Sequence, residues 1–320
     1  MAGAVTRRRL GKTGLELPII GFGASPLGGV YQEPLDEEEA IKAVHEAFKS
    51  GMNYFDTSPY YGNLRSERVL GRALKDLPRE QIIVATKVGR YGTDTFDFSA
   101  ERVTKSVHES LERLQVSYLD LIQTHDIEFG DLDQVVKETL PALQKLKQAG
   151  VVRHIGITGL PLKIFPAVLD RVEPGTVDAV LSYCHYSLND SSLETLIPYL
   201  KSKGVGIINA SLLSMGLLTE QGPPEWHPAP EEVKAACKQA AEYAKAHGSN
   251  ISKLAIKWAL QQDSIASHLI GFTKPQQVYM NVETAQSPLT AEEKGILAEV
   301  QKILAPVHNV TWPSGRPENN

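Results

Sequence analysis

Cysteine is almost absent from this chain of 320 residues, which contains only Cys184 and Cys237. Two cysteines far apart in the sequence provide neither a disulfide framework nor the paired spacing of a thiolate zinc site. We therefore expect no structural disulfide and no bound metal ion. A protein without disulfides is typical of a reducing compartment, so we expect a cytoplasmic location.

Long apolar runs and an excess of positive charge are also missing. No stretch of about 18 consecutive apolar residues is present, which argues against a transmembrane helix. The first nine residues are not followed by the apolar segment of a secretory signal. The formal net charge is −5, whereas nucleic-acid binding usually needs a basic surface. These features predict a protein that has neither a membrane nor a nucleic acid among its partners, and they leave the oligomeric state open.

The remaining composition is that of a folded globular protein. Hydrophobic residues make up 42% of the chain and charged residues 22%, which is close to the average for soluble domains. The length is about twice that of a usual domain, but barrels of alternating strands and helices reach this size as one unit. We therefore expect a single domain over residues 1–320.

Short apolar segments alternate with longer segments of helical periodicity along the chain. Eight short segments suit strands that are buried on both faces, namely Ile19–Gly23, Asn53–Thr57, Ile82–Lys87, Leu119–His125, His154–Thr158, Ala179–Tyr183, Val205–Ala210 and His268–Phe272. Helical periodicity is found in Glu37–Ser50, Ser99–Leu114, Leu132–Ala149, Ser191–Lys203 and Ala291–Leu304. Before the first strand, Gly11–Gly14 separates two extended pieces, which predicts a hairpin.

This alternation is compatible with a closed barrel or with an open, doubly wound sheet. The open sheet should carry a dinucleotide-binding glycine loop after its first strand. In Gly21–Gly28 the third glycine is misplaced and no helix follows directly. Because eight strands are the number that closes a barrel, we predict an α/β fold of the (β/α)₈ TIM-barrel type. Loop 213–229 follows the seventh strand, and it could line a pocket or serve only packing.

Four polar residues stand at or just after the carboxyl ends of three successive strand segments: Asp56, Tyr61, Lys87 and His125. In a barrel these strand ends meet at one mouth. A lysine at the end of an apolar strand is costly unless it is paired, and Asp56 on the neighbouring strand is the natural partner. Each residue alone has a structural explanation, but the combination favours a catalytic site.

The four residues suit proton transfer at a substrate oxygen. A nearby ammonium lowers the pKa of a phenol from about 10, so Lys87 would make Tyr61 a usable proton acceptor or donor. His125 would hydrogen-bond to the same oxygen and orient it. No serine or cysteine beside a base and no set of metal ligands is evident. The missing electrophile is therefore a cofactor, and hydride transfer to a nicotinamide agrees with this chemistry.

At these residues the sequence resembles the aldo-keto reductase superfamily. Asp56, Tyr61, Lys87 and His125 match the catalytic tetrad of that family, and Gly51–Gly62 is similar to its first signature. The resemblance extends over essentially the whole chain. It implies a barrel whose N-terminal β-hairpin caps the bottom.

Further segments resemble a plant branch of this superfamily that oxidises sugars. The longest are Gly216–Pro228 and Leu304–Gly315. This resemblance implies oxidation of L-galactose at C1 by NAD⁺ to L-galactono-1,4-lactone, a step toward ascorbate, with Tyr61 as general base. The chain departs from the branch at positions near the expected pocket, so the exact aldose and anomer stay open; these positions are Val88, Gln123, Thr124 and Leu212.

The resemblance also implies which residues contact the ligands. Those on the cofactor side are Gly23, Thr158, Gly159, Tyr183, Ser211, Met215, Gly216, Gly271, Thr273, Lys274, Gln277 and Asn281. Those on the sugar side are Tyr61, His125, Asp126, His185 and Trp226. NADP-preferring relatives clamp the 2′-phosphate with basic residues at positions equivalent to Gly271 and Gln277. Neither residue is basic here, so we predict NAD rather than NADP, although Lys274 is nearby.

Three alternatives share the barrel. The first is a broad carbonyl reductase that uses NADPH, and the second is a dehydrogenase of a related aldose such as L-fucose. The third is a cofactor-sensing subunit of a membrane assembly, which the intact tetrad disfavours. Tyr183 has two interpretations as well, since it can stack on the nicotinamide or be a plain aromatic residue at a strand end.

Overall fold

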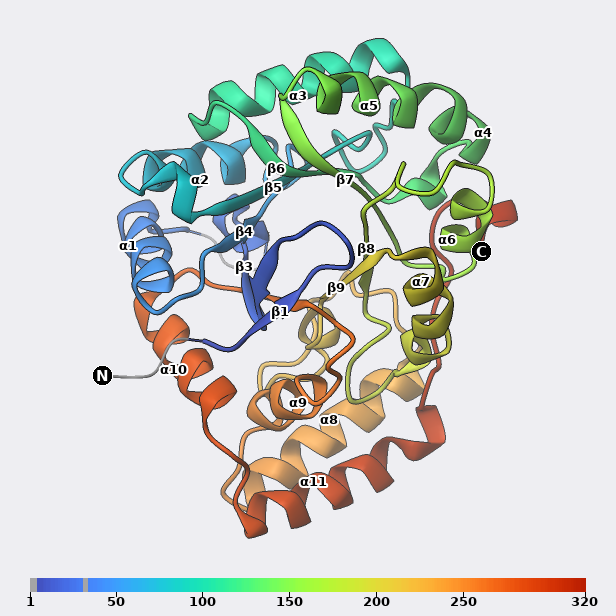
Figure 1. Ribbon diagram of the computed structural model, residues 1–320. Helices are drawn as coiled ribbons and strands as arrows, with labels where there is room; N and C mark the ends of the chain where they lie inside the picture. Colours follow the sequence, from blue (N-terminus) through green and yellow to red (C-terminus); the bar gives the residue numbers. More distant parts are fainter. Residues whose placement is uncertain (1–4, 31–33) are drawn as a thin grey trace.

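Eight parallel strands close into a barrel in the computed structural model, which describes residues 5–30 and 34–320 (Figure 1). The barrel strands are β3 Ile20–Gly23, β4 Tyr54–Asp56, β5 Ile83–Val88, β6 Leu119–Thr124, β7 Val152–Gly159, β8 Ala179–Tyr183, β9 Gly206–Ala210 and β10 Ser267–Gly271. Each strand pairs with the next, and β10 pairs with β3 to close the ring. The predicted barrel is confirmed, and every predicted strand lies within two residues of its observed bounds.

The strands are apolar because both of their faces are buried. Alternate side chains point into the barrel, where Leu17, Leu121, Leu181 and Leu269 belong to one inner cluster. The other side chains point outward and pack against the surrounding helices. β5 is buried along its whole length, so the polar members at its end, Thr86 and Lys87, have to find partners.

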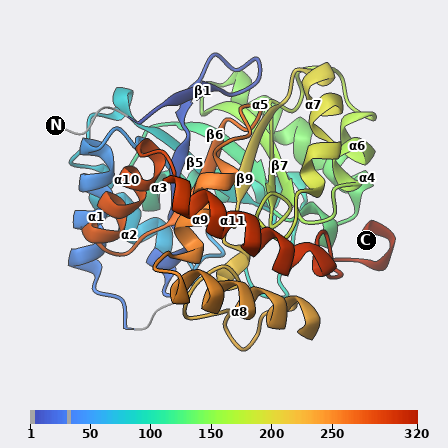
Figure 2. The same cartoon turned by 90° about the horizontal axis from the view of Figure 1, so that it is seen from below.

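Helices cover the outside of the barrel. Their bounds are α1 Glu37–Lys49, α2 Arg65–Leu74, α3 Ala100–Leu114, α4 Leu132–Gln134, α5 Leu140–Gln148, α6 Ile164–Leu169, α7 Ile197–Lys203, α8 Glu231–Ala246, α9 Ile251–Ala259, α10 Pro275–Gln286 and α11 Ala291–Leu304. α1 begins at Asp36, whose carboxylate accepts the N–H of Glu39 at 3.0 Å and so caps the helix. α8 and α11 lie side by side, away from the strands (Figures 1 and 2).

Two predicted helices are divided by proline. In the predicted helix 132–149, a π-helical turn over Val135–Thr139 separates α4 from α5. Pro141 near the start of α5 has no N–H to donate to the preceding turn, so the ladder is interrupted there. Similarly, the predicted helix 191–203 is a 3₁₀ turn followed by α7, which begins beside Pro198.

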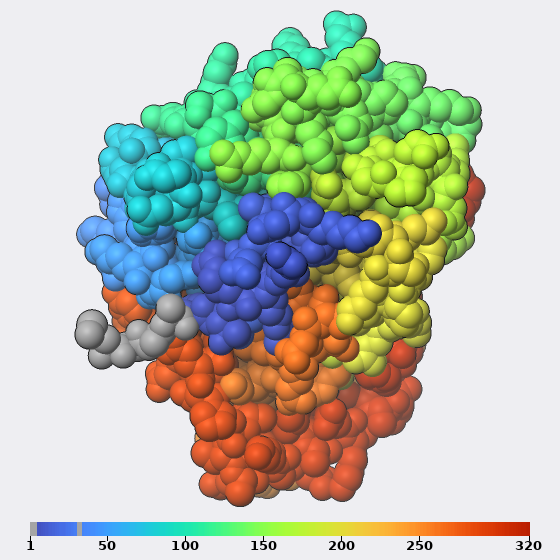
Figure 3. Space-filling view, in the orientation of Figure 1, coloured from blue at the N-terminus to red at the C-terminus, as the bar shows by residue number. Residues whose placement is uncertain are grey.

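The N-terminal hairpin closes one end of the barrel. Its strands are β1 Arg7–Arg9 and β2 Glu16–Pro18, which pair antiparallel. Hairpin atoms cover the centre of this face (Figure 3), and Leu10 is completely buried. A side chain on Gly11 would place Cβ 2.4 Å from the backbone nitrogen of Gly206, so glycine is required where the turn meets β9. The predicted cap is therefore confirmed, and ligands must enter from the other end.

Two further features are relevant to function. Within residues 5–30 and 34–320, no helix is both long enough and apolar enough to cross a bilayer. In the same part of the chain, His, Cys, Asp and Glu side chains form no group of three or more that could hold a metal ion. Cys184 and Cys237 are both buried free thiols.

Candidate active site

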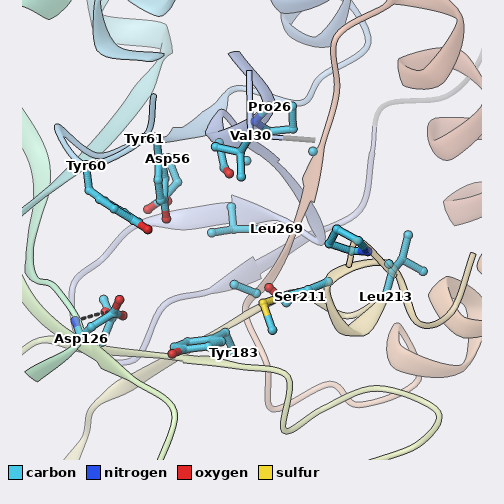
Figure 4. A pocket seen from close by; sticks show the side chains of 18 of the residues that line it. Pro26, Val30, Asp56, Tyr60, Tyr61, Asp126, Tyr183, Ser211, Leu213 and Leu269 are labelled. Atoms are coloured by element: carbon cyan, nitrogen blue, oxygen red, sulfur yellow. Dashed lines mark hydrogen bonds between the residues drawn. The ribbon is translucent and has the colours of Figure 1, made fainter. Parts of the chain in front are cut away.

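A cavity of about 1570 Å³ opens at the carboxyl-terminal end of the barrel. The strand ends and the loops that follow them supply its walls, as expected for this architecture. Tyr60, Tyr61 and Asp56 lie on one side of it and Tyr183 on the other (Figure 4). Loop 213–229 contributes Met215, Gly216 and several later residues, so this loop lines the pocket. The volume exceeds that of a typical ligand pocket, roughly 300–1,000 Å³, and leaves room for two ligands.

The four predicted catalytic residues meet at the base of this cavity. The ammonium of Lys87 forms an ion pair with Asp56 and donates a hydrogen bond to the carbonyl of Thr57 at 2.8 Å. Lys87 Nζ is also 4.8 Å from the centre of the Tyr61 ring. The rings of Tyr61 and His125 stand edge to face, with their centroids 5.7 Å apart. β4, β5, β6 and the loop after β4 therefore bring these side chains together.

The charge on Lys87 is maintained by its partners. The side chain is only 1% exposed, and burial by itself lowers the pKa of Lys87. The negative charge of Asp56, together with the interactions of the ammonium with Asp56 and Tyr61, acts in the opposite direction and prevails, so the pKa of Lys87 lies above its ordinary value. Lys87 is therefore a permanent cation at the base of the cavity.

The pKa of Tyr61 differs from the expectation. We expected Lys87 to lower it, but the protein around the phenol raises the pKa of Tyr61 above its usual value. Lys87 does act to lower it, but Asp56 and Asp126 oppose that effect. Burial is the largest cause of the raised pKa of Tyr61, because the surrounding protein disfavours the charged phenolate. In this structure Tyr61 is therefore a neutral phenol that can donate a proton, rather than a stable phenolate.

His125 is held as a neutral ring. Burial lowers the pKa of His125 to about 3, so the ring carries no charge at neutral pH. Its Nδ1 lies 3.0 Å from the hydroxyl of Ser58, and that hydroxyl accepts the N–H of Tyr60 at 3.1 Å. Donation by the Ser58 hydroxyl to Nδ1 corresponds to the tautomer with the proton on Nε2. The Nε2–H can donate a hydrogen bond to a substrate oxygen.

Two supporting residues were missed by the sequence analysis. The amide nitrogen of Gln123 donates to the second carboxylate oxygen of Asp56 at 2.7 Å, so both oxygens of that buried group are satisfied. Gln123 stands two residues before His125 and therefore points into the barrel from the same strand, which is a signal that alternation could have provided. Ser58 could not have been found in this way, because its contact depends on the conformation of the loop after β4.

Comparison with known proteins identifies the family. The family model described as "Aldo/keto reductase family" matches residues 19–302. The chain belongs to the aldo/keto reductase family. It is 58% identical to the L-galactose dehydrogenase of Arabidopsis thaliana, with 98% of both chains covered. It is 34% identical to the D-arabinose 1-dehydrogenase of Saccharomyces cerevisiae, with 91% of this chain and 93% of that protein covered.

A solved structure shows the same barrel. The holo form of an aldo-keto reductase from Bacillus halodurans superimposes with a TM-score of 0.76 at 30% identity, covering 92% of this chain and 96% of that one. The predicted superfamily and fold are thus confirmed. The tetrad of this aldo/keto reductase occupies the position that the fold assigns to catalytic groups.

Most residues predicted to contact the ligands line the cavity. Those on the cofactor side that do so are Gly23, Thr158, Tyr183, Ser211, Met215, Gly216, Gly271, Thr273, Lys274 and Gln277. They extend from the tetrad to the N-terminus of α10, which agrees with an elongated ligand. Asp126 and Trp226 line the cavity as well, and Trp226 is 54% exposed at its rim. The volume of the site and the spread of these lining residues are compatible with a nicotinamide dinucleotide.

Three predicted residues lie outside the cavity wall. His185 is buried, and its Nδ1 is 3.0 Å from both Asp190 and Ser192, so its ring is held in the loop after β8. Asn281 donates to the carbonyl of Gln277 within α10. A side chain on Gly159 would meet Ile164 and Glu128 instead of a ligand. The family resemblance had implied ligand contacts for these residues, and the structure places them just outside the cavity wall.

The carboxyl group of Glu128 lies behind Tyr183. Its Oε1 accepts hydrogen bonds from Leu160 N–H at 3.1 Å, the Tyr183 hydroxyl at 3.3 Å and the Ser314 hydroxyl at 3.0 Å. Burial, together with the charge of Asp126, raises the pKa of Glu128 to about 8. Glu128 thus ties the C-terminal segment to the ring that borders the cavity.

Proposed function

We propose that this aldo/keto reductase is a single-domain, NAD-dependent sugar dehydrogenase that oxidises L-galactose at C1 to L-galactono-1,4-lactone, a step toward ascorbate. The observation that carries the proposal is the 58% identity to the Arabidopsis L-galactose dehydrogenase over almost the whole of both chains. The similarity to the D-arabinose 1-dehydrogenase of yeast, whose name gives another aldose as its substrate, supports the same class of substrate. The buried free thiols support a cytoplasmic location.

The tetrad has the groups that such an oxidation needs. The bound nicotinamide supplies the acceptor for the hydride that leaves C1. Tyr61 first releases its own proton to solvent, and Lys87 stabilises the phenolate that remains. This phenolate then receives the proton of the C1 hydroxyl and becomes neutral again. His125 donates from Nε2 to the same oxygen and orients it. Asp56 holds Lys87 in place by their ion pair, and Gln123 in turn holds the Asp56 carboxylate.

Contacts at α10 support NAD over NADP. The side-chain oxygen of Gln277 accepts the backbone N–H of Thr273 at 2.8 Å and of Lys274 at 3.1 Å. These amides at a helix N-terminus are the donors that a 2′-phosphate would otherwise attract. Lys274 Nζ is 4.0 Å from a carboxylate oxygen of Glu39, so its charge is shared. A 2′-phosphate would have to displace both interactions.

The direct test measures initial rates of reduced-nicotinamide formation. L-Galactose, L-fucose and D-arabinose are each supplied with NAD⁺ and, separately, with NADP⁺ at subsaturating concentration. We expect the fastest turnover with L-galactose and NAD⁺. Turnover of L-fucose above that of L-galactose would correct the sugar, and preference for NADP⁺ would contradict the cofactor. Inactivity on all three sugars, with reduction of simple aldehydes by NADPH, would replace the proposal by a broad carbonyl reductase.

A further inference from the structure

Arg90 is a cation held in an aromatic cage on the wall of the cavity. It follows β5 by two residues, and its guanidinium carbon lies 4.0 Å from the ring centroid of Tyr60, 5.1 Å from that of Phe129 and 5.3 Å from that of Phe96. Phe96 and Phe129 are themselves stacked, with centroids 4.6 Å apart. A guanidinium held between aromatic faces keeps its charge and loses its freedom to move. The tetrad does not use this group.

Asp126 is the fixed partner of Arg90. Its Oδ2 accepts a hydrogen bond from Arg90 Nη1 at 2.5 Å, and its Oδ1 accepts one from the Thr158 hydroxyl at 3.2 Å. Its backbone N–H donates to the same Thr158 oxygen at 2.9 Å. The φ angle of Asp126 is +49°, a conformation that aspartate tolerates better than most residues. The carboxylate is therefore held at one position by both neighbours.

The pair stands directly beside the reacting position. Asp126 Oδ2 is 3.6 Å from His125 Nε2, the atom that would contact the substrate oxygen. Arg90 and Asp126 both line the cavity. In the described part of the chain, Arg90 Nε is buried and has no hydrogen-bond partner. The guanidinium and the carboxylate are thus both fixed on the cavity wall, with the carboxylate beside the atom of His125 that would contact the reacting oxygen.

We propose that the Arg90–Asp126 pair recognises the hydroxyl group on the carbon next to the reacting carbon. A hydroxyl both donates and accepts, so it can donate to Asp126 and accept from Arg90 at once. Oxygens on neighbouring carbons lie within hydrogen-bonding distance of each other, which matches the closeness of Asp126 to His125. The substrates selected are aldoses and 2-hydroxyaldehydes. This inference rests on the proposed function for the identity of the sugar. The preference for a hydroxyl group next to the reacting carbon does not depend on which sugar it is.

A purely structural role makes a different prediction. If Arg90 only fastened the segment around Phe129 to β5, its loss would lower stability and would affect all substrates equally. If the pair reads a hydroxyl, its loss affects only substrates that carry that hydroxyl. The ratio of kcat/KM for two substrates that differ in one hydroxyl therefore separates the two roles.

The experiment compares L-galactose with 2-deoxy-L-galactose in the wild type, Arg90→Met and Arg102→Met. Methionine retains much of the apolar stem within the cage and removes the donors. Arg102 is the matched control because it also lies over an aromatic ring, 3.9 Å from the centroid of Tyr91, and pairs with Glu109 at 3.1 Å, yet it does not line the cavity. We expect the wild type to favour L-galactose by about 10- to 100-fold in kcat/KM, the usual effect of hydrogen bonds to charged groups.

In Arg90→Met we expect this ratio to fall to within about threefold of unity, chiefly through a higher KM for L-galactose. Arg102→Met should keep the wild-type ratio. The inference is overturned if the wild type does not discriminate, or if folded Arg90→Met discriminates as well as the wild type. Arg90→Leu, which also lacks donors, serves for the same comparison if Arg90→Met does not fold.

A second pair of substrates separates this inference from the proposed function. If the wild type oxidises neither sugar, the proposed function fails, and the ratio is measured instead in the direction of reduction. Lactaldehyde and propanal differ by the hydroxyl next to the carbonyl, and each is supplied with NADH and NADPH. Preference for lactaldehyde that is lost in Arg90→Met upholds the inference, and equal rates in the wild type overturn it.

Discussion

Strand β5 carries two neighbouring polar residues that lead to two different regions of the molecule. Thr86 points outward, where its hydroxyl donates to Glu67 at 2.6 Å and Arg113 donates to the other oxygen of Glu67 at 2.5 Å. Lys87 points inward to Asp56 and the cavity. Each region has a buried carboxylate paired with a cation, and the exposed fraction is 0% for Glu67 and 2% for Asp56.

The comparison shows that burial and ion pairing do not by themselves mark a functional site. Glu67 joins helices α2 and α3 to the barrel, and neither Glu67 nor Arg113 is among the residues that line the active-site cavity. The network of Asp56 differs in one respect, since its cation also approaches Tyr61 in a space that a ligand can enter. A charge acts catalytically only where a reacting group is beside it.

The strongest test of the inner region removes the hydroxyl of Tyr61. In Tyr61→Phe we expect kcat to fall by roughly 10²- to 10⁴-fold because the proton acceptor is lost, while the affinity for NAD⁺ is almost unchanged. Stopped-flow turnover and fluorescence titration of cofactor would measure the two quantities. Tyr118→Phe, which alters a tyrosine packed between Arg79 and Arg153, should leave kcat at the wild-type value. Wild-type turnover in Tyr61→Phe would show that the proton moves elsewhere.

The corresponding test of the outer region replaces Glu67 by glutamine. Arg113 then loses its buried counter-charge, so we expect the free energy of unfolding to fall by about 3–5 kcal/mol. Urea unfolding measures this change, and kcat should remain near the wild-type value in the folded fraction. In the corresponding variant of the inner region, Asp56→Asn, we expect the larger effect on kcat instead of on the free energy of unfolding. If both variants lost the same property, the distinction between the two regions would fail.

A third test uses pH to probe Glu128, a buried carboxyl group that has structural partners like Glu67 but lies near the cavity like Asp56. Because burial raises its pKa from 4.5 to about 8, the folded protein holds a proton that the unfolded chain releases. Stability from this group is therefore complete at low pH and is lost as the pH rises toward 8, by at most about 1.4 kcal/mol per pH unit. Glu128→Gln, which imitates the protonated carboxyl, should flatten this part of the stability profile. An unchanged slope in thermal unfolding between pH 5 and pH 8 would contradict the assignment.

The smallest expected effect concerns the far end of the cavity. Gln277→Arg frees the amides of Thr273 and Lys274 and adds a cation, so we expect kcat/KM with NADP⁺ to rise roughly tenfold relative to NAD⁺. Steady-state rates with L-galactose at subsaturating cofactor give this ratio. Gln286→Arg at the other end of α10 is a control for charge alone. An equal rise in that variant would show that the effect is not local to Gln277.

The fold was predictable because its determinants are local. Each strand is a short apolar run between a helix and a loop, and eight such runs leave few architectures. The tetrad was predictable for the same reason, because Asp56, Lys87 and His125 stand where apolar strands end. The interruption of the predicted helix 132–149 coincides with Pro141, a residue that interrupts the hydrogen bonds of a helix.

The contacts around the tetrad were less predictable from the sequence. Arg90 stands in the loop after β5 and Glu128 in a short 3₁₀ turn after β6, and only the folded path of these segments brings Arg90 to Asp126 and Glu128 to Tyr183. His185 is the opposite case, since it stands just after a strand but is turned toward Asp190 by hydrogen bonds within its loop. Sequence spacing can assign a residue to one end of the barrel, but it cannot say where a loop side chain points.

The sequence by itself determined the alternation of strands and helices, the order of the strands and the chemical groups at their ends. These depend on periodicity, which acts over a few residues. Only the tertiary structure decided the protonation of those groups, because a pKa is the sum of burial and of charges that are far apart in the chain. Lys87 alone would lower the pKa of Tyr61, but barrel closure surrounds the phenol with protein and brings Asp56 to the lysine.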